Sequence, residues 1–307
     1  MSNPIHSLLH STTAASLVTE QQIVTVQYNA SIEEAVQKLK KNSLQAVPVM
    51  KENECLGFVD VSDILAYVVS VVPADLEDYL TLIAQGTTQR AMAWPQVSQI
   101  VDRSGADPYV PVFVETPLSQ LLNLFGAGQV HRVLLVNREQ QPSAIVSQTD
   151  IVKFVASQFV RGDIKNMAAK SLTELGFAPK SVISVLETES VVEVLKKMAA
   201  QKVTAVAVTN AEGALVANFS ASDLFNLYDK ATPQFQAPVR EFLEQYSERS
   251  LAPICVRVEQ SFAEVAAVFA EQGLHHAFVL DADMKPANIA SLSDLCQIAA
   301  AYEYQEV

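Results

Sequence analysis

The sequence repeats one supersecondary unit four times, and this repetition constrains the fold more than any other feature. In each copy an apolar helix, a strand, a polar turn and a second strand lead to an aspartate near the start of another helix. A unit of this size has a small sheet with an uncovered apolar face, so the copies are expected to pack against one another. The aspartate follows the first helix cap by 32, 34, 33 and 33 positions, in Ser31–Asp63, Thr116–Asp150, Ser190–Asp223 and Ser261–Asp294 respectively.

The second copy, residues 129–155, shows the unit most completely. It predicts strands over 133–136 and 144–146, followed by Ser147-x-x-Asp150 at the start of an apolar helix. The basic pair His131-Arg132 precedes the first of these strands. A strand end that meets a helix N-terminus is a place where phosphate and ribose groups can be held.

The first helix of every copy begins with a signal for a helix start. In a capping box, a Ser hydroxyl and a Glu three residues later satisfy backbone N–H groups reciprocally. In the second copy, Thr116-Pro117 predicts proline at the first helical position. The predicted boxes are Ser31–Glu34, Ser190–Glu193 and Ser261–Glu264.

Composition limits the partners. Half of the 307 residues are apolar and 18% are charged, which is typical of a packed globular protein. A net charge of −13 disfavours nucleic acid and anionic membranes, so a bound phosphate would need a local basic cluster. The N-terminus lacks signal-peptide features, and the longest apolar run, 64–73, is too short to span a bilayer. The three cysteines (Cys55, Cys255 and Cys296) are expected to be buried reduced thiols, which predicts a cytoplasmic or nuclear protein.

The four units, with their G/A-x-x-[ST]-x-x-D endings, resemble CBS domains, and consecutive copies resemble CBS pairs (Bateman modules). Four copies, the His131-Arg132 pair and the connector 170–176 together resemble the gamma subunit of the AMP-activated/SNF1-type protein kinase. The likeness covers the chain from about Val18 to its end. It implies a mixed α/β (α+β) fold of four helix–strand–strand–helix repeats, arranged as two Bateman modules in a flat disc. The implied modules are 1–161, with repeats about 18–71 and 109–160, and 162–307, with repeats about 165–230 and 238–303.

The resemblance also implies binding of AMP, ADP or ATP, with each aspartate accepting hydrogen bonds from a ribose. A simpler alternative is that Ser147, Ser220 and Ser291 form capping boxes with those aspartates without any ligand. In the first copy Asp60 replaces the expected Ser or Thr and would repel a phosphate. The third copy has Thr204 but no basic pair. The candidate ligand-binding residues are Asp63, His131, Arg132, Ser147, Asp150, Thr204, Ser220, Asp223, His275, His276, Ser291, Ser293 and Asp294.

In the resembled family, residues like His131-Arg132 and His275-His276 contact phosphates at a shared centre. The alternative is a solvated edge. Gln45 and His276 stand where that family carries arginine, so the basic centre is weaker and favours AMP over ATP, or weaker binding overall.

We find no Gly-rich phosphate loop, nucleophile elbow or metal-binding histidine pair in the sequence, so an enzyme is not expected. Two functions stay open. One is a regulatory subunit that binds adenine nucleotides and assembles with kinase catalytic (alpha-type) and scaffold (beta-type) subunits. The other is a stand-alone tandem-CBS protein, nucleotide-binding or scaffolding, which regulates another enzyme or forms a homodimer. The long connector 84–109 is expected to be a functional loop.

Overall fold

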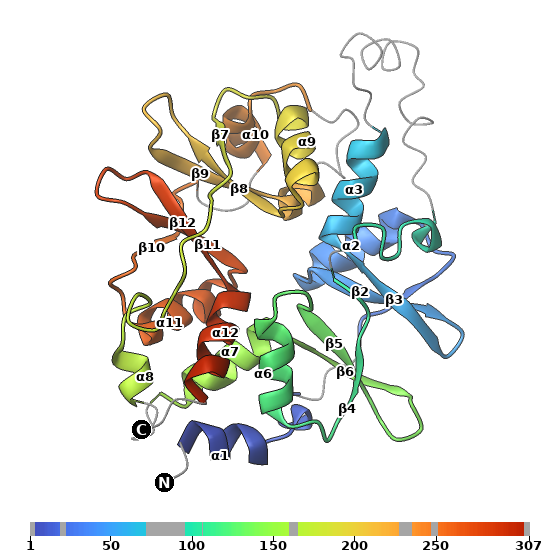
Figure 1. Ribbon diagram of the computed structural model, residues 1–307. Coiled ribbons are helices and arrows are strands. Elements are labelled where there is room, and N and C mark those ends of the chain that lie inside the picture. Colours follow the sequence, from blue (N-terminus) through green and yellow to red (C-terminus); the bar gives the residue numbers. More distant parts are fainter. Residues whose placement is uncertain are drawn as a thin grey trace. The chain divides into compact units, whose positions relative to one another are not determined.

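The computed structural model describes residues 4–18, 23–71, 96–105, 107–159, 165–226, 235–246 and 251–303. Over these residues it has four three-stranded sheets, one in each predicted repeat (Figure 1). This confirms the mixed α/β fold of four repeats. In every sheet the middle strand pairs in parallel with a short first strand and antiparallel with the third. The first strand was missed from sequence because two or three residues are too few to show an alternating pattern.

Repeats 1 and 2 have the same order of elements. Repeat 1 comprises β1 (Val26–Gln27), α2 (Ile32–Asn42), β2 (Ala46–Lys51), β3 (Glu54–Asp60) and α3 (Val61–Val71). Repeat 2 comprises β4 (Pro111–Phe113), α6 (Leu118–Gly126), β5 (Arg132–Val136), β6 (Pro142–Ser147) and α7 (Gln148–Ser157).

Repeats 3 and 4 follow the same plan, except that a 3-10 helix replaces the last α-helix of repeat 3. Repeat 3 comprises β7 (Ser184–Leu186), α9 (Val191–Gln201), β8 (Ala205–Thr209), β9 (Leu215–Ser220) and η3 (Ala221–Asn226). Repeat 4 comprises β10 (Cys255–Val256), α11 (Phe262–Gln272), β11 (His276–Leu280), β12 (Pro286–Ser291) and α12 (Leu292–Glu303).

The helix starts agree with the capping signals in part. Helices α9 and α11 begin with closed capping boxes, as predicted. At α2, Ser31 accepts the Glu34 N–H at 3.2 Å, but the Glu34 carboxylate pairs with Lys38 at 2.8 Å and the structure shows no closed box. Pro117 is the N-cap of α6 and not its first residue, a shift of one position from the prediction.

The repeats are grouped into two compact units. Unit 1 is Met1–Ile23, Asp107–Val182 and Ile254–Val307, and therefore contains repeats 2 and 4. Unit 2 is Val24–Ala106 and Ile183–Pro253, and contains repeats 1 and 3. The units thus join alternate repeats, whereas the predicted modules join consecutive ones. The predicted module boundary, between 161 and 162, falls outside the described residues.

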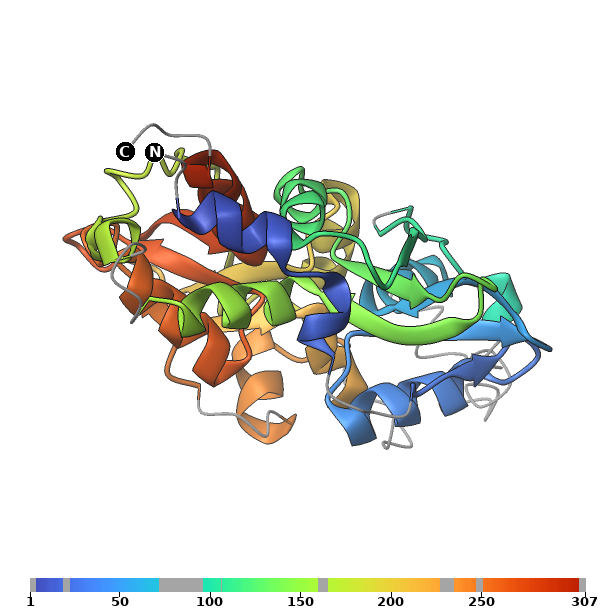
Figure 2. The same ribbon diagram turned by 90° about the horizontal axis from the view of Figure 1, so that it is seen from below.

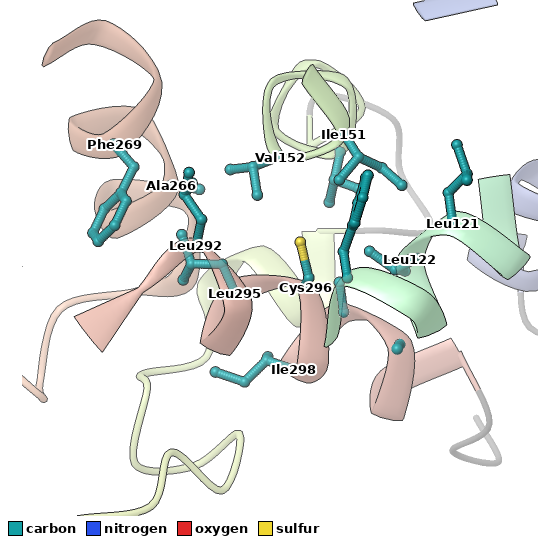
Figure 3. Packing of buried hydrophobic residues seen from close by; sticks show 14 of the residues in the cluster. Leu121, Leu122, Ile151, Val152, Ala266, Phe269, Leu292, Leu295, Cys296 and Ile298 are labelled. Atoms are coloured by element: carbon teal, nitrogen blue, oxygen red, sulfur yellow. The ribbon is translucent and has the colours of Figure 1, made fainter. Parts of the chain in front are cut away.

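The core of unit 1 combines helix and strand residues of repeats 2 and 4 with residues of the segments that precede repeats 1 and 3, and Figure 3 shows the part between the helices. Gly126 of α6 faces α12 so closely that an added Cβ would lie 3.0 Å from the Gln297 Cα. A larger residue at this position would force the two backbones apart, so glycine sets the spacing of these helices. The labelled side chains are Leu121 and Leu122 of α6, Ile151 and Val152 of α7, Ala266 and Phe269 of α11, and Leu292, Leu295, Cys296 and Ile298 of α12.

The core of unit 2 combines helices and sheet residues of repeats 1 and 3. Helix α3 packs against α9, and the helix α10 (Val239–Tyr246) packs against both α9 and β9. Phe219 and Phe242 meet edge to face with ring centroids 5.9 Å apart, a favoured aromatic geometry. Each unit therefore buries the apolar helix faces that a single repeat would leave uncovered.

In the described part of the chain, the segments that precede the repeats, here called lead-in segments, do not bridge to the repeat that follows them. Each one bridges instead to its consecutive partner, repeat 1 with repeat 2 and repeat 3 with repeat 4. The segment before repeat 1 contains α1 (Pro4–Ser11) and η1 (Ala14–Leu17), and it packs on repeat 2, where Thr13 bridges to Pro117. Figure 2 shows the dark blue α1 beside the green helices of repeat 2.

The other lead-in segments behave in the same way. The lead-in segment before repeat 2 contains η2 (Val97–Gln99) and bridges to repeat 1. The lead-in segment before repeat 3 contains α8 (Lys165–Ala169) and bridges to repeat 4. The lead-in segment before repeat 4 contains α10 and bridges to repeat 3. These bridges link repeats 1 with 2 and 3 with 4 through the chain, although the predicted grouping of consecutive repeats into modules stays a prediction.

Residues 84–95 and 106 of the connector 84–109 lie outside the described residues. Among the helices that the structure describes, none combines the length and hydrophobicity that crossing a bilayer requires.

We expect Leu9→Ala to destabilise unit 1, because the fully buried Leu9 of α1 packs in its core. The expected loss is about 2–5 kcal/mol, the range for a buried leucine truncated to alanine. Chemical denaturation of the whole chain measures it. Leu186→Ala, at a side chain that is 46% exposed, is the control and should change stability by less than about 0.5 kcal/mol. Equal effects of the two variants would contradict the docking of α1.

Candidate functional site

The four aspartates of the repeated signature all accept a backbone hydrogen bond at a helix start. In each, Oδ2 accepts the N–H of the residue three positions earlier, at 3.0 Å in repeat 1 and 2.7 Å in the other three. In repeats 2, 3 and 4 the serine hydroxyl donates to the same oxygen. The capping alternative therefore describes Oδ2 correctly, and only Oδ1 of each carboxylate is left for other partners. The pairs are Asp60–Asp63, Ser147–Asp150, Ser220–Asp223 and Ser291–Asp294.

In repeat 1, both carboxylate oxygens of Asp63 accept backbone hydrogen bonds. Oδ1 accepts the N–H of Ser104 at 2.8 Å, and the side chains of Asp60 and Asp63 are buried. Burial and the neighbouring charge of Asp60 raise the pKa of Asp63 to about 7, against the hydrogen bonds from Ser104 and Asp60 that lower it. Asp60, which stands where the signature has Ser or Thr, thus forms a pair of buried carboxyl groups with Asp63, and the two repel each other when both are ionised.

In repeat 4, the Asp294 carboxylate is neutralised from within the chain. Lys180 places its Nζ 2.5 Å from Asp294 Oδ1, and the backbone N–H of Lys180 donates to Asn288 Oδ1 at 2.9 Å. The carboxylate oxygen that does not cap the helix is therefore paired with an ammonium group. Lys180 was not identified from the sequence because it lies far from Asp294 in the chain and within no recognisable motif.

In repeat 3, Asp223 is buried, whereas Thr204 is exposed. The Thr204 carbonyl accepts the N–H of Ala221, and Ala205 lies opposite Ser220 across the strand pair. The structure therefore brings Thr204 and Ser220 to the same end of the sheet. The Ser220 and Ser222 hydroxyl groups lie 2.8 Å apart.

In repeat 2, the carboxylate of Asp150 is half-buried and keeps one oxygen available. Its Oδ2 binds the backbone and hydroxyl of Ser147, and among the described residues Oδ1 accepts no hydrogen bond or ion pair. Nearby, Gln148 Nε2 donates to Ser293 Oγ at 2.9 Å, which joins the helix starts of repeats 2 and 4. The Ser293 hydroxyl, a predicted ligand contact, is thus already in a bond within the protein.

The two basic pairs of unit 1 come together. Desolvation, followed by the positive charges of His276, Arg132 and His131, lowers the pKa of His275 to about 4. His275 is a solvent-exposed residue, yet its lowered pKa disfavours protonation of the ring, so we expect it to be neutral at pH 7. That these groups form a shared phosphate centre, as the family resemblance implied, stays a prediction.

A carboxylate that sequence analysis did not identify lies against this centre. The backbone N–H of His131 donates to Asp107 Oδ1 at 2.8 Å, and the Nδ1 of the same histidine lies 3.4 Å from that oxygen. Arg132 Nε lies 3.1 Å from Asp107 Oδ2. Burial alone would raise the pKa of Asp107, but the hydrogen bonds from His131 and the charge of Arg132 hold it below its usual value. An isolated aspartate between two repeats carries no sequence signal of this role.

Over the described residues, we find no group of three or more His, Cys, Asp or Glu side chains arranged to hold a metal ion. Cys55, Cys255 and Cys296 are free thiols; Cys296 is buried, whereas Cys55 and Cys255 are only partly covered, contrary to the expectation for those two. Burial raises the pKa of the Cys255 and Cys296 thiols, so neither of these two is activated as a nucleophile.

A family model described as the CBS domain matches four segments of the chain, at residues 14–70, 97–157, 177–230 and 246–301. Protein SDS23 from Eremothecium gossypii is 28% identical over 231 residues, which are 68% of this chain and 45% of the relative. Protein SDS23 from Saccharomyces cerevisiae is 28% identical over 234 residues, 69% of this chain and 43% of the relative. The chain thus spans less than half the length of these curated relatives.

Two solved structures share the fold over nearly the whole chain. One is a protein from Methanocaldococcus jannaschii, described as an archaeal homolog of g-AMPK, with a TM-score of 0.73 and 16% identity; the match covers 93% of this chain and 99% of that one. The other is an uncharacterized conserved protein from Pyrococcus horikoshii, with a TM-score of 0.58 and 18% identity, covering 94% and 100%. At these identities the likeness concerns the fold alone.

We expect Asp60→Ser to make stability less dependent on pH. The pKa of Asp63 is higher in the folded than in the unfolded state. Proton binding at Asp63 therefore stabilises the fold fully below about pH 4, and this stabilisation is lost as the pH rises through about 7. Replacing Asp60 removes the repelling charge and restores the serine of the other repeats. Unfolding free energies at pH 5 and pH 8 should therefore differ less, with a gain at pH 8 of about 1 kcal/mol.

The control for this variant is Glu212→Ser, which removes an exposed charge from the same unit. It should leave the pH dependence unchanged. If Asp60→Ser and the parent protein lose the same stability between pH 5 and pH 8, the acid pair does not have the assigned effect.

Proposed function

The chain belongs to the CBS-domain family, and on that premise we propose that it is a non-catalytic regulatory protein that binds an adenine nucleotide in repeat 2. The carrying observation is that Oδ1 of Asp150 accepts no hydrogen bond or ion pair from the residues that the structure describes. The matching oxygen accepts a hydrogen bond from Ser104 N–H in repeat 1 and is paired with Lys180 in repeat 4. A half-buried carboxylate held in place by Ser147 suits the paired hydroxyl groups of a ribose.

The charge near this site supports a ligand with few phosphates. Arg132 is paired with Asp107, and the low pKa of His275 leaves that ring uncharged near neutral pH. A centre with little net positive charge attracts a polyphosphate weakly. We therefore propose AMP as the preferred ligand, with ADP and ATP binding less tightly.

For the partner, we propose a kinase complex with catalytic (alpha-type) and scaffold (beta-type) subunits. The support is the four-repeat fold shared with the M. jannaschii protein described as an archaeal homolog of g-AMPK, which is a likeness of fold only. The alternative is a stand-alone or homodimeric CBS protein that regulates another enzyme, which is compatible with the SDS23 relatives. Free thiols are consistent with the proposed cytoplasmic or nuclear location.

Affinity purification of the chain from its native cells, followed by mass spectrometry, separates these partners. A kinase catalytic subunit that co-purifies in stoichiometric amount supports the complex. Recovery of the chain alone, as a monomer or dimer by light scattering, favours the stand-alone protein.

We expect Asp150→Asn to weaken AMP binding at least about tenfold, because charge-assisted hydrogen bonds contribute about 1.5–3 kcal/mol each. Isothermal titration calorimetry on the whole chain measures this loss. Asp283→Asn, which removes an exposed carboxylate of the same unit, is the control and should bind AMP as the parent does. Unchanged binding by the Asp150 variant, or no AMP binding by the parent protein, would rule out the proposed site.

We also expect Lys180→Ala to add a second binding site by freeing Oδ1 of Asp294. The number of AMP molecules bound per chain should rise from about one to about two, because the ammonium no longer occupies the ribose position. Lys285→Ala, an exposed lysine of the same repeat, should leave the number unchanged. A constant stoichiometry in both variants would show that Lys180 does not block repeat 4.

A further inference from the structure

We propose that Asp107 determines how many phosphate groups the nucleotide site accepts, because its negative charge neutralises Arg132 from within the protein. This inference rests on the proposed function, since it concerns the phosphate end of the same ligand. It assigns to Asp107 a role that neither the repeat signature nor the basic pairs contain.

Asp107 is held against the basic pair from two sides. Its side chain is 2% exposed, and Oδ1 accepts the His131 N–H while Oδ2 lies 3.1 Å from Arg132 Nε. The His131 N–H therefore fixes the carboxylate by a hydrogen bond, whereas Oδ2 meets Arg132 as an ion pair and has no hydrogen-bond partner in the described part of the chain. A phosphate oxygen that approached Arg132 Nε would have to displace a buried carboxylate whose low pKa keeps it charged.

Arg132 is nevertheless only partly satisfied. Its side chain is 12% exposed, and its Nη1 is buried without a hydrogen-bond partner in the described part of the chain. A guanidinium group carries five N–H donors, and a buried unpaired donor is costly. The remaining donors suit one anionic group in addition to Asp107.

The arrangement favours one phosphate over several. A monophosphate could approach the exposed part of the Arg132 side chain while Asp107 keeps its place. Every further phosphate adds negative charge near a carboxylate that has already neutralised Arg132, and His275 supplies no compensating charge because its pKa is about 4. Repulsion between like charges then grows with the length of the phosphate chain.

Asp107→Asn tests the inference because it removes the charge and retains an oxygen for the His131 N–H. We expect ATP binding by the whole chain to strengthen about tenfold more than AMP binding, by calorimetry at low salt. Inorganic tripolyphosphate, which lacks adenosine, should also bind about tenfold more tightly. Asp107→Ser is a second neutral variant that should act in the same direction, and Asp107→Glu should keep the discrimination of the parent.

The matched control is Glu115→Gln, which removes a carboxylate that pairs with Arg138 at 3.3 Å on the exposed surface of the same unit. It should leave the ratio of ATP to AMP affinity unchanged. Equal strengthening of AMP and ATP in Asp107→Asn, or an equal shift in the control, would overturn the role of Asp107.

The tripolyphosphate measurement separates this inference from the proposed function. If adenine nucleotides bind to no variant but tripolyphosphate binds more tightly to Asp107→Asn, the role of Asp107 stands and the nucleotide site fails. If AMP binds to the parent through Asp150 but the neutral variants leave tripolyphosphate binding unchanged, the nucleotide site stands and the role of Asp107 fails.

Discussion

The structure depends on the burial of apolar helix faces between alternate repeats. A three-stranded sheet with two helices cannot cover its own apolar surface, and at about 25 cal/mol per Å² that surface is a large driving force for pairing. In unit 1 the close approach of α6 and α12 at Gly126 buries the apolar faces of these two helices against each other. The same packing brings the basic pairs of repeats 2 and 4 together, so the geometry of the candidate site follows from the core.

Sequence was most informative where the signal was local. Capping residues and apolar periodicity located the helices and hairpins of all four repeats, and the family match confirms the resemblance to CBS domains. Local signals also have local limits: Glu34 pairs with Lys38 because an i,i+4 partner competes with the predicted box. The short first strands carry too few residues to be recognised.

The chemistry of the site was less accessible because it depends on contacts between distant segments. The aspartates and basic pairs were found as motifs, but the groups that face them were not. Asp107, Lys180 and Ser104 each lie in a lead-in segment, and each occupies an atom that a motif alone would leave for a ligand. A repeat signature therefore predicts where a site can form, whereas the lead-in segments determine which sites are still open.

The interleaving of the two units has a consequence for how the protein is made. Each core takes residues from both halves of the chain, and unit 1 includes segments at both the beginning and the end of the sequence. When the ribosome has synthesised repeats 1 and 2, each unit has only one of its two repeats. The apolar helix faces of these repeats are then still exposed. Unit 2 can close once residues near 253 emerge, but unit 1 has to wait for the last helix. Such nascent chains expose apolar surface until α12 has been made, and exposed apolar surface favours aggregation.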